Sequence, residues 1–173
     1  VPAAQLSTGN SGNIFVSAGG DLEFYAGRDN TTFAQLGHGG YVSRDSHSGN
    51  ITLEVTGGIA FHGGVDYLDT NPAQANPGGN EYSFAKLGHG GYDADGTHSG
   101  DISVTAGQFG VGHAEAGQGV VFRAGAWTDN FAQMGHGGLA ARTYGTAGNE
   151  QGLSGAISVN ALGDITFVGG TGS

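Results

Sequence analysis

The chain has 173 residues, no cysteine and a formal net charge of −10, with five Lys and Arg against fifteen Asp and Glu. The missing cysteines exclude disulfides and thiolate metal sites, and the acidic balance argues against nucleic-acid binding, because phosphates attract basic patches. Its 37 glycines have no strict three-residue period, which excludes a collagen helix, and no apolar run approaches the ~20 residues of a transmembrane helix.

The predicted elements follow one another in a repeating order. Residues 4–9 are a partial copy of a phrase that is complete at 33–41. Residues 11–18 begin with Ser-Gly and continue with alternating apolar residues, which predicts a strand with one buried face. Copies of this first phrase start at Ser11, Ser48, Ser99 and Ser154.

The second phrase is a shorter alternating strand closed by small residues, at 21–27, 58–64, 119–125 and 164–170. The third phrase reads Phe-Ala-Gln-Leu-Gly-His-Gly-Gly-Tyr at 33–41 and recurs with few changes at 84–92 and 131–139. Three such copies, in phase with two other phrases, indicate an internal structural repeat.

Together the phrases predict an all-β protein: a parallel β-solenoid, or β-helix, of about four turns with three strands per turn. The first phrase recurs at intervals of 37, 51 and 55 residues, and we expect insertions at the corners, at 65–81, 109–118 and 140–152. Equivalent residues would then stack about 4.8 Å apart. A β-propeller is the competing fold, but it needs four strands per blade and more copies.

The whole chain, residues 1–173, is expected to form one solenoid domain that starts and ends within a turn. Its assembly ends would be Ala4, Gln5 and Leu6 at one side, and Ile165 and Phe167 at the other. A solenoid end exposes unpaired backbone groups and a section of apolar core, and we find no amphipathic cap. Either flanking turns of a larger chain cover these ends, or copies stack head-to-tail into a homopolymer.

Residues 11–22, Ser-Gly-Asn-Ile-Phe-Val-Ser-Ala-Gly-Gly-Asp-Leu, resemble the repeats of filamentous-haemagglutinin-type secreted adhesins, and residues 154–167 repeat the likeness. The resemblance covers most of the chain as a pattern. The Gly-His-Gly-Gly phrase and the long repeat interval depart from that family. The resemblance implies a secreted stalk or fibre at a bacterial surface, and it carries over no binding residue.

His38, His89 and His136 occupy one position of the third phrase, so we expect them to form a column through the stack. Imidazoles about 4.8 Å apart could bind a metal. The interpretation that we favour is a structural ladder, in which neutral rings pass hydrogen bonds along the column or to corner carbonyls. His47 and His98 are expected to form a second, shorter column.

Asp93, Asp95 and Asp101 are the candidate calcium ligands, because their spacing is similar to that of acidic calcium loops. Calcium takes six to eight oxygens, and the distal Glu of an EF-hand loop is missing. An Asp-Gly turn explains the same residues. We therefore expect no cofactor, with calcium as the open alternative.

The sequence has no catalytic motif such as Gly-x-Ser-x-Gly, a P-loop or a zinc-protease spacing, and its five Lys and Arg are scattered. We therefore expect a protein that is not an enzyme. A lyase or hydrolase on a β-helix would need acidic residues that converge in one groove. Aromatic residues could form a sugar-binding strip, although repeated aromatics more often stack and stiffen a corner; they are Tyr25, Tyr41, Tyr92 and Trp127.

The sequence thus predicts a non-enzymatic structural protein of an extracellular fibre or surface adhesin, located outside the cell or on a bacterial surface. Its expected partner is itself, without nucleic acid or membrane insertion. The alternative is a carbohydrate-binding or calcium-stabilised adhesin module from a longer repeat protein.

Overall fold

The computed structural model describes residues 9–27, 29–43, 45–64, 81–108, 117–140 and 152–170. Within these ranges the chain consists of strands and turns, with no helix, and hence with no helix that could cross a membrane. Ala4, Gln5 and Leu6 lie outside the described residues, as do most of the three predicted insertions.

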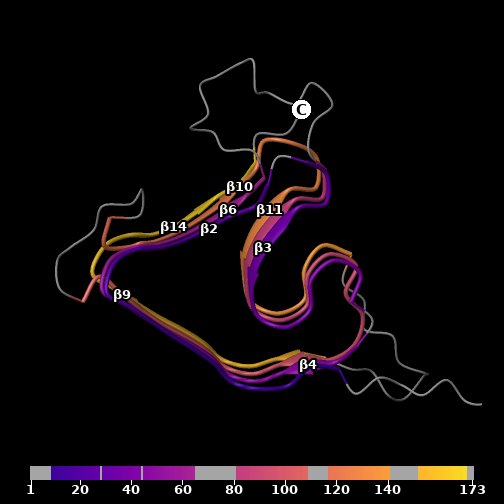
Figure 1. The fold of residues 1–173 in the computed structure, drawn as a ribbon, viewed down its shortest axis with the longest axis horizontal. Coiled ribbons are helices and arrows are strands. Elements are labelled where there is room, and N and C mark those ends of the chain that lie inside the picture. Colours follow the sequence, from indigo (N-terminus) through magenta and orange to yellow (C-terminus); the bar gives the residue numbers. More distant parts are fainter. Residues whose placement is uncertain are drawn as a thin grey trace, which may run out of the picture.

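Each phrase of the repeat supplies one strand to a parallel sheet that runs through the molecule (Figure 1). The first-phrase sheet contains β1 (Ile14–Ala18), β5 (Ile51–Val55), β9 (Ile102–Ala106) and β13 (Ile157–Ala161). The second-phrase sheet contains β2 (Leu22–Tyr25), β6 (Ile59–Gly63), β10 (Val120–Ala124) and β14 (Ile165–Val168). The third-phrase sheet contains β3 (Phe33–Leu36), β7 (Phe84–Leu87) and β11 (Phe131–Met134).

A fourth sheet, which the sequence did not predict, is made of two-residue strands before each Ser-Gly corner. This short sheet contains β4 (His47–Ser48), β8 (His98–Ser99) and β12 (Leu153–Ser154). Two residues carry no readable alternation, so sequence periodicity could not reveal them. The two complete repeats, β4 to β7 and β8 to β11, therefore each have three longer strands and one very short one.

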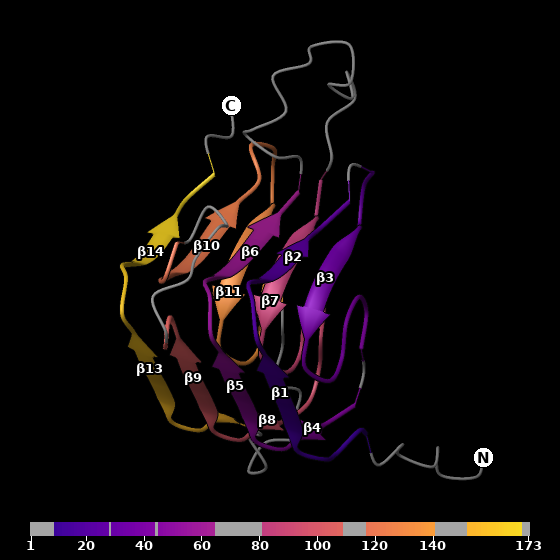
Figure 2. The ribbon, with the colours of Figure 1, turned by 60° about the vertical axis from the view of Figure 1, so that its left-hand side comes forward.

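Strand pairing joins equivalent residues of successive repeats. Ile14 pairs with Ile51, Ile51 with Ile102, and Ile102 with Ile157. Figure 2 shows the resulting rows of strands side by side. The prediction of an all-β fold with parallel sheets is confirmed, and this arrangement is compatible with a β-solenoid.

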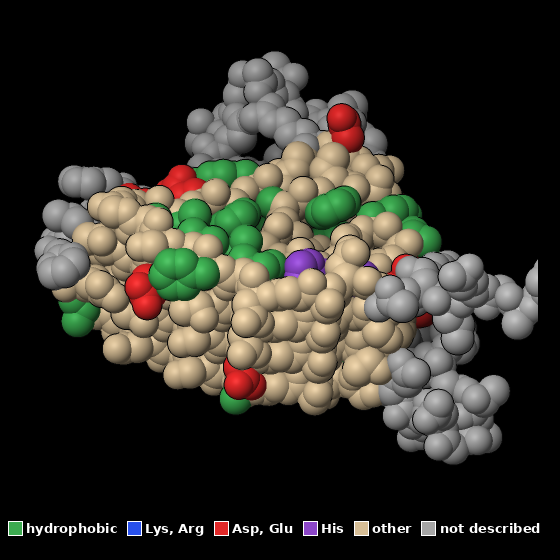
Figure 3. Space-filling model, turned by 60° about the horizontal axis from the view of Figure 1, so that its bottom comes forward, with side chains coloured by type: hydrophobic (Ala, Val, Ile, Leu, Met, Phe, Trp, Pro, Cys, Tyr) green, Lys and Arg blue, Asp and Glu red, His purple; other side chains and the backbone are tan. Residues whose placement is uncertain are grey.

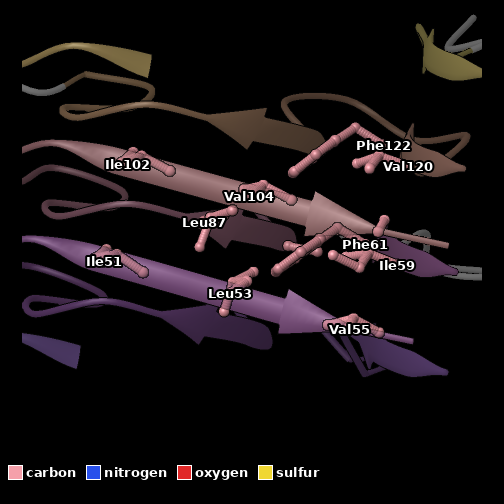
Figure 4. Close-up of a cluster of buried hydrophobic side chains, with 12 residues drawn as sticks. Ile51, Leu53, Val55, Ile59, Phe61, Leu87, Ile102, Val104, Val120 and Phe122 are labelled. Atoms are coloured by element: carbon pink, nitrogen blue, oxygen red, sulfur yellow. The ribbon is translucent and has the colours of Figure 1, made fainter. Parts of the chain in front are cut away.

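The three longer sheets enclose one hydrophobic core (Figure 4). Alternate residues of β5 point inward, so Ile51, Leu53 and Val55 are fully buried between the repeats on either side. Phe61 on β6 stacks between Phe24 and Phe122, with ring centroids 4.5 and 4.8 Å away. Burying a side chain of this size contributes about 1.5–3 kcal/mol, so the inner repeats provide most of the stabilisation.

A column of glycines allows the turn after the third phrase to stack closely. Gly37 and Gly88 have φ of 152° and 136°, and a Cβ at either would lie 2.1 Å from the carbonyl oxygen of the next repeat, at Gly88 or Gly135. No side chain fits at that distance. This contact explains the glycine that follows the third-phrase strand in the first two complete copies.

Candidate functional site

The histidines of the third phrase form one stacked column. The ring centroids of His38 and His89 are 5.0 Å apart, those of His89 and His136 are also 5.0 Å apart, and both ring pairs are parallel to within 7°. The strands β3, β7 and β11 position the rings, because each histidine follows its strand by two residues.

Hydrogen bonds occupy the ring nitrogens of this column. The amide of His38 donates to Nδ1 of His89 at 2.9 Å, and the amide of His89 donates to Nδ1 of His136 at 3.2 Å. Because a backbone amide only donates, these Nδ1 atoms accept and the proton resides on Nε2. The Nε2 atoms of His89 and His136 then donate to the carbonyl oxygens of Gly49 and Gly100, both at 2.8 Å.

This bonding leaves no ring lone pair of His89 or His136 for a metal ion. In addition, the described residues contain no group of three or more His, Cys, Asp or Glu that could hold one. The column instead joins the turn after the third phrase to the Ser-Gly corner, where Gly12, Gly49 and Gly100 lie.

Burial favours the neutral form of His89 and His136, because it disfavours the charged form. It lowers the pKa of His89 from 6.5 to about 4, with a further lowering from His136 and His38 and an opposing effect of the bond to Gly49. Burial also lowers the pKa of His136, against the bond to Gly100. Protonation would place a second N–H against the amide that donates to Nδ1.

A second histidine column lies in the short sheet. The rings of His47 and His98 are 5.3 Å apart, and Nδ1 of His47 accepts from the amide of Asn10 at 3.2 Å while its Nε2 bonds the Ser43 hydroxyl. His98 is fully buried, and burial lowers its pKa to about 4.

Among the described residues both ring nitrogens of His98 lack a hydrogen-bond partner. For Nε2 the reason lies in the sequence: Ala94 precedes His98 by four residues, as Ser43 precedes His47, so the hydroxyl that bonds Nε2 of His47 is missing at this level. Nδ1 has no donor because the His47 amide bonds the Thr97 carbonyl oxygen instead. In the next repeat Leu153 pairs with His98, and the column ends there.

Lys86, on β7, is a fully buried amine in line with two glutamines. Its Nζ donates to Oε1 of Gln133 at 3.0 Å and to the carbonyl oxygen of Gly135 at 2.6 Å. Gln35 and Gln133 hold the equivalent positions on β3 and β11. Burial lowers the pKa of Lys86 from 10.5 to about 7, so a large fraction of the amine is neutral at pH 7.

The three candidate calcium ligands do not gather around one point. Asp101 accepts the amide of Ala156 at 2.8 Å, as Asn50 accepts the amide of Asp101 and Asn13 that of Asn50, both at 2.9 Å. Asp101 thus belongs to a ladder of side-chain acceptors on one corner. Asp93 and Asp95 lie in a different corner, where Asp93 has a left-handed φ of 47°.

The predicted assembly ends are partly described. Ile165 and Phe167, on β14, are 47% and 61% exposed, whereas the paired residues of β10, Val120 and Phe122, are at most 1% exposed. The core therefore opens to solvent beside β14. At the opposite end of the stack, where β1, β2 and β3 lie (Figure 2), Figure 3 also shows hydrophobic side chains gathered, above a side face with few charged side chains.

The exposed aromatics form short stacks along the corners. Tyr41 and Tyr92 stack at 5.1 Å, and Tyr82 leans on Tyr92 at 4.9 Å with its ring tilted by 51°. Tyr25 belongs to another column, where it stacks on His62 at 4.6 Å. Trp127 is 39% exposed, so the four predicted aromatics do not form one strip.

Two features of the site were missed by sequence reasoning. Lys86 was treated as one of several scattered cations, although its replacement of a repeated glutamine marked it as unusual. The ladder of Asn13, Asn50 and Asp101 was readable as an Asn or Asp after each of the first three Ser-Gly pairs.

Comparison with protein-family models, with curated proteins and with solved structures found no match.

Proposed function

We propose that the chain is a β-solenoid of about four turns and serves as a structural, non-enzymatic element of an extracellular fibre or bacterial surface adhesin. The observation that carries this proposal is the opening of core columns at the end of the stack. Ile51 and Ile102 are at most 1% exposed, but Ile157, in the same column, is 51% exposed. Such surface favours burial against a further layer.

The polar side chains support a mechanical role. The histidine column, the Asn and Asp ladder and Lys86 all bond across successive repeats. Each cross-repeat bond would resist separation of turns under tension. This use of polar groups differs from an enzyme, whose acids and bases converge on a cleft.

We propose that a second copy of the chain, stacked head-to-tail, covers each exposed end of the stack. One end presents β1 and β2, and the other presents β13 and β14, which are outer strands of the same two sheets. An open strand edge accepts another strand of matching path. Repetition of this contact between unlike ends gives a filament rather than a closed ring.

Electron microscopy of the purified 173-residue chain at neutral pH, with and without calcium, tests this proposal. Regular thin fibres of uniform width are the expected result. Discrete monomers in both conditions would remove head-to-tail assembly, and fibres that need calcium would favour the calcium-stabilised alternative.

A carbohydrate-binding adhesin module is the second candidate, and the tyrosine cluster favours it. Tyr41 and Tyr82 both lie against Tyr92, and Asp93 is next in the chain. Aromatic faces beside a carboxylate suit a sugar ring. Quenching of tyrosine fluorescence by soluble oligosaccharides, lost in Tyr41→Ala, would support this candidate.

A further inference from the structure

The two ends of the stack are not flat, and one of them contains a notch. The first-phrase and second-phrase sheets have four strands each, but the third-phrase sheet has three and ends at β11. β14 pairs with β10, and β11 follows β10 in the chain, so β14 lies one layer beyond β11. Among the described residues no strand pairs with the outer edge of β11, so this edge lies one strand spacing, about 4.8 Å, below β14.

The notch has at its floor a glycine and a glutamine, Gly135 and Gln133, whose equivalents in the earlier repeats contact the next third-phrase strand and the turn after it. A Cβ at Gly37 or Gly88 would meet the next repeat at 2.1 Å, but at Gly135 the nearest atom is Cδ1 of Ile157 at 3.6 Å. Gln133 has the place of Gln35, whose Nε2 donates to the carbonyls of Gly88 and Gly90 at 2.9 and 3.0 Å.

We propose that this notch binds a single β-strand, supplied by the segment that precedes Asn10 in a second copy of the chain. The inference rests on the proposed function, because it specifies the contact by which copies would join. Among the described residues the notch is one strand wide, since β12 and β14 already occupy the next layer on either side.

The path of the chain points to this occupant. If β1 and β2 of a second copy stack on β13 and β14, its Asn10 lies over the short sheet, because Ser11 bridges to Ser48 in that sheet. In the described repeats a third-phrase strand precedes a short strand in the chain, as β3 precedes β4, so the position before Asn10 in this stacked copy is that of a third-phrase strand over β11. In sequence, residues 4–9 align with the third phrase, although their own placement lies outside the described residues.

Ser7 and Thr8 replace the glycine and histidine of the complete phrase. The strand would therefore be held by backbone pairing with β11, and by the donors of Gln133, rather than by an extended histidine column. Backbone pairing along a free edge is the mode by which extended peptides add to sheets.

Substitutions at two glycines distinguish strand binding in the notch from head-to-tail stacking of whole copies. Gly135→Ala places a methyl group on the floor of the notch, toward the incoming strand. Gly12→Ala is the matched control: φ is 149° at Gly12 and 130° at Gly135, and nothing lies within 4 Å of a Cβ at Gly12. In the same column, a Cβ at Gly155 would meet the Gly100 oxygen at 1.9 Å, so the Gly12 methyl would clash with a stacked copy.

The experiment measures binding of two fluorescent synthetic peptides, one copying residues 1–12 and one copying residues 33–41, to the full-length Gly12→Ala protein by anisotropy. We expect the 1–12 peptide to bind. Adding Gly135→Ala to this protein should weaken the affinity for the peptide at least about tenfold, because the free-energy cost of an overpacked contact corresponds to more than a tenfold change in Kd. Wild-type protein, diluted below its assembly concentration, gives the same comparison if Gly12→Ala does not fold.

The outcomes separate this inference from the proposed function. If the peptide does not bind, or if Gly135→Ala leaves its binding unchanged, the proposal that the notch binds a strand is overturned, even where wild-type fibres form. Binding of the 1–12 peptide without wild-type fibres supports the notch and counts against fibre formation. Binding of the 33–41 peptide alone overturns the assigned occupant, because the notch would then take a complete third phrase.

Discussion

The backbone amide of His38 donates to Nδ1 of His89 at 2.9 Å, across 51 residues of sequence. The same bond recurs between His89 and His136. One histidine per repeat thus accepts from the repeat before it and donates through Nε2 to a Ser-Gly corner. The arrangement requires neutral imidazole at His89 and His136.

Acid should destabilise the fold between pH 6.5 and about 4. Burial holds the pKa of His89 and His98 near 4, below the ordinary 6.5, so the unfolded chain binds more protons in this window. The stabilisation is complete above pH 6.5 and is lost as pH falls toward 4. Thermal unfolding followed by circular dichroism from pH 8 to pH 4 measures the effect.

His89→Gln serves as the comparison for this acid effect. It should lower the midpoint temperature of thermal unfolding at pH 7, because the Gly49 carbonyl oxygen and the His38 amide lose their hydrogen-bond partners. Each unsatisfied group costs about 1–3 kcal/mol of stability. Its midpoint should also fall less between pH 6.5 and 4. A variant with an unchanged pH dependence would show that other groups cause the acid effect.

Lys86→Gln should stabilise the protein, because it completes a ladder of glutamines and removes a buried amine. The pKa of Lys86 is about 7 in the folded chain and 10.5 in the unfolded one, so wild-type stability rises with pH between these values. The gain of Lys86→Gln is therefore largest at pH 7 and below. We expect its midpoint to rise by at least about 2–4 °C, the shift that 1 kcal/mol gives at this size.

Lys86→Met controls for charge removal alone. It leaves the Gly135 carbonyl oxygen and Oε1 of Gln133 without their donor, so its gain should be smaller than that of Lys86→Gln. Equal midpoints for the two variants would contradict the glutamine ladder. A loss of stability in both would mean that the amine contributes more than its burial costs.

The sequence was most informative where residues repeat and least informative where repeats differ. Period-2 alternation in the first two phrases predicted the longer strands, because each such strand buries one face. The histidine column was predictable as an alignment, but its hydrogen bonds were not, since they depend on which carbonyl lies opposite each ring. The unpaired Nε2 of His98 follows from a single exchange, Ser43 to Ala94.

The backbone conformation at the corners could not be predicted from the sequence either. Val42, Asp93 and Ala140 share a left-handed φ of 47° to 56° at equivalent positions after the third phrase. A valine in that region is unusual, because its branched Cβ crowds the backbone. Nothing in residue type at Val42 indicated the conformation, which the stacking of the corner imposes.

Val42→Gly should therefore stabilise the protein by about 1 kcal/mol, the strain of a left-handed non-glycine residue. Asp93→Gly, in the same column, should gain less, because aspartate tolerates this region better than valine does. Urea unfolding of both variants provides the comparison. A larger gain at Asp93 than at Val42 would contradict the assignment of strain to side-chain branching.

Gly88→Ala should destabilise the monomer far more than Gly135→Ala. Both glycines have similar φ, 136° and 130°, so the conformational cost is matched. A Cβ at Gly88 would lie 2.1 Å from the Gly135 oxygen, whereas a Cβ at Gly135 would make only an ordinary contact, 3.6 Å from Cδ1 of Ile157. The difference should be about 1–3 kcal/mol or more, the cost of overpacking. Equal midpoints at a concentration that keeps the chain monomeric would show that the stack can relax.

Salt should promote fibre formation by this chain. Each copy has a net charge of −10, so stacked copies repel one another, while their contact surfaces include apolar residues such as Ile157 and Phe167. At 0.01 M salt the Debye length is about 30 Å and at 0.15 M about 8 Å, so added salt screens the repulsion between neighbouring bodies. Light scattering at 0.01 and 0.15 M sodium chloride should show faster growth at the higher concentration. Scattering that falls with salt would mean that ion pairs, rather than apolar burial and strand pairing, hold the copies together.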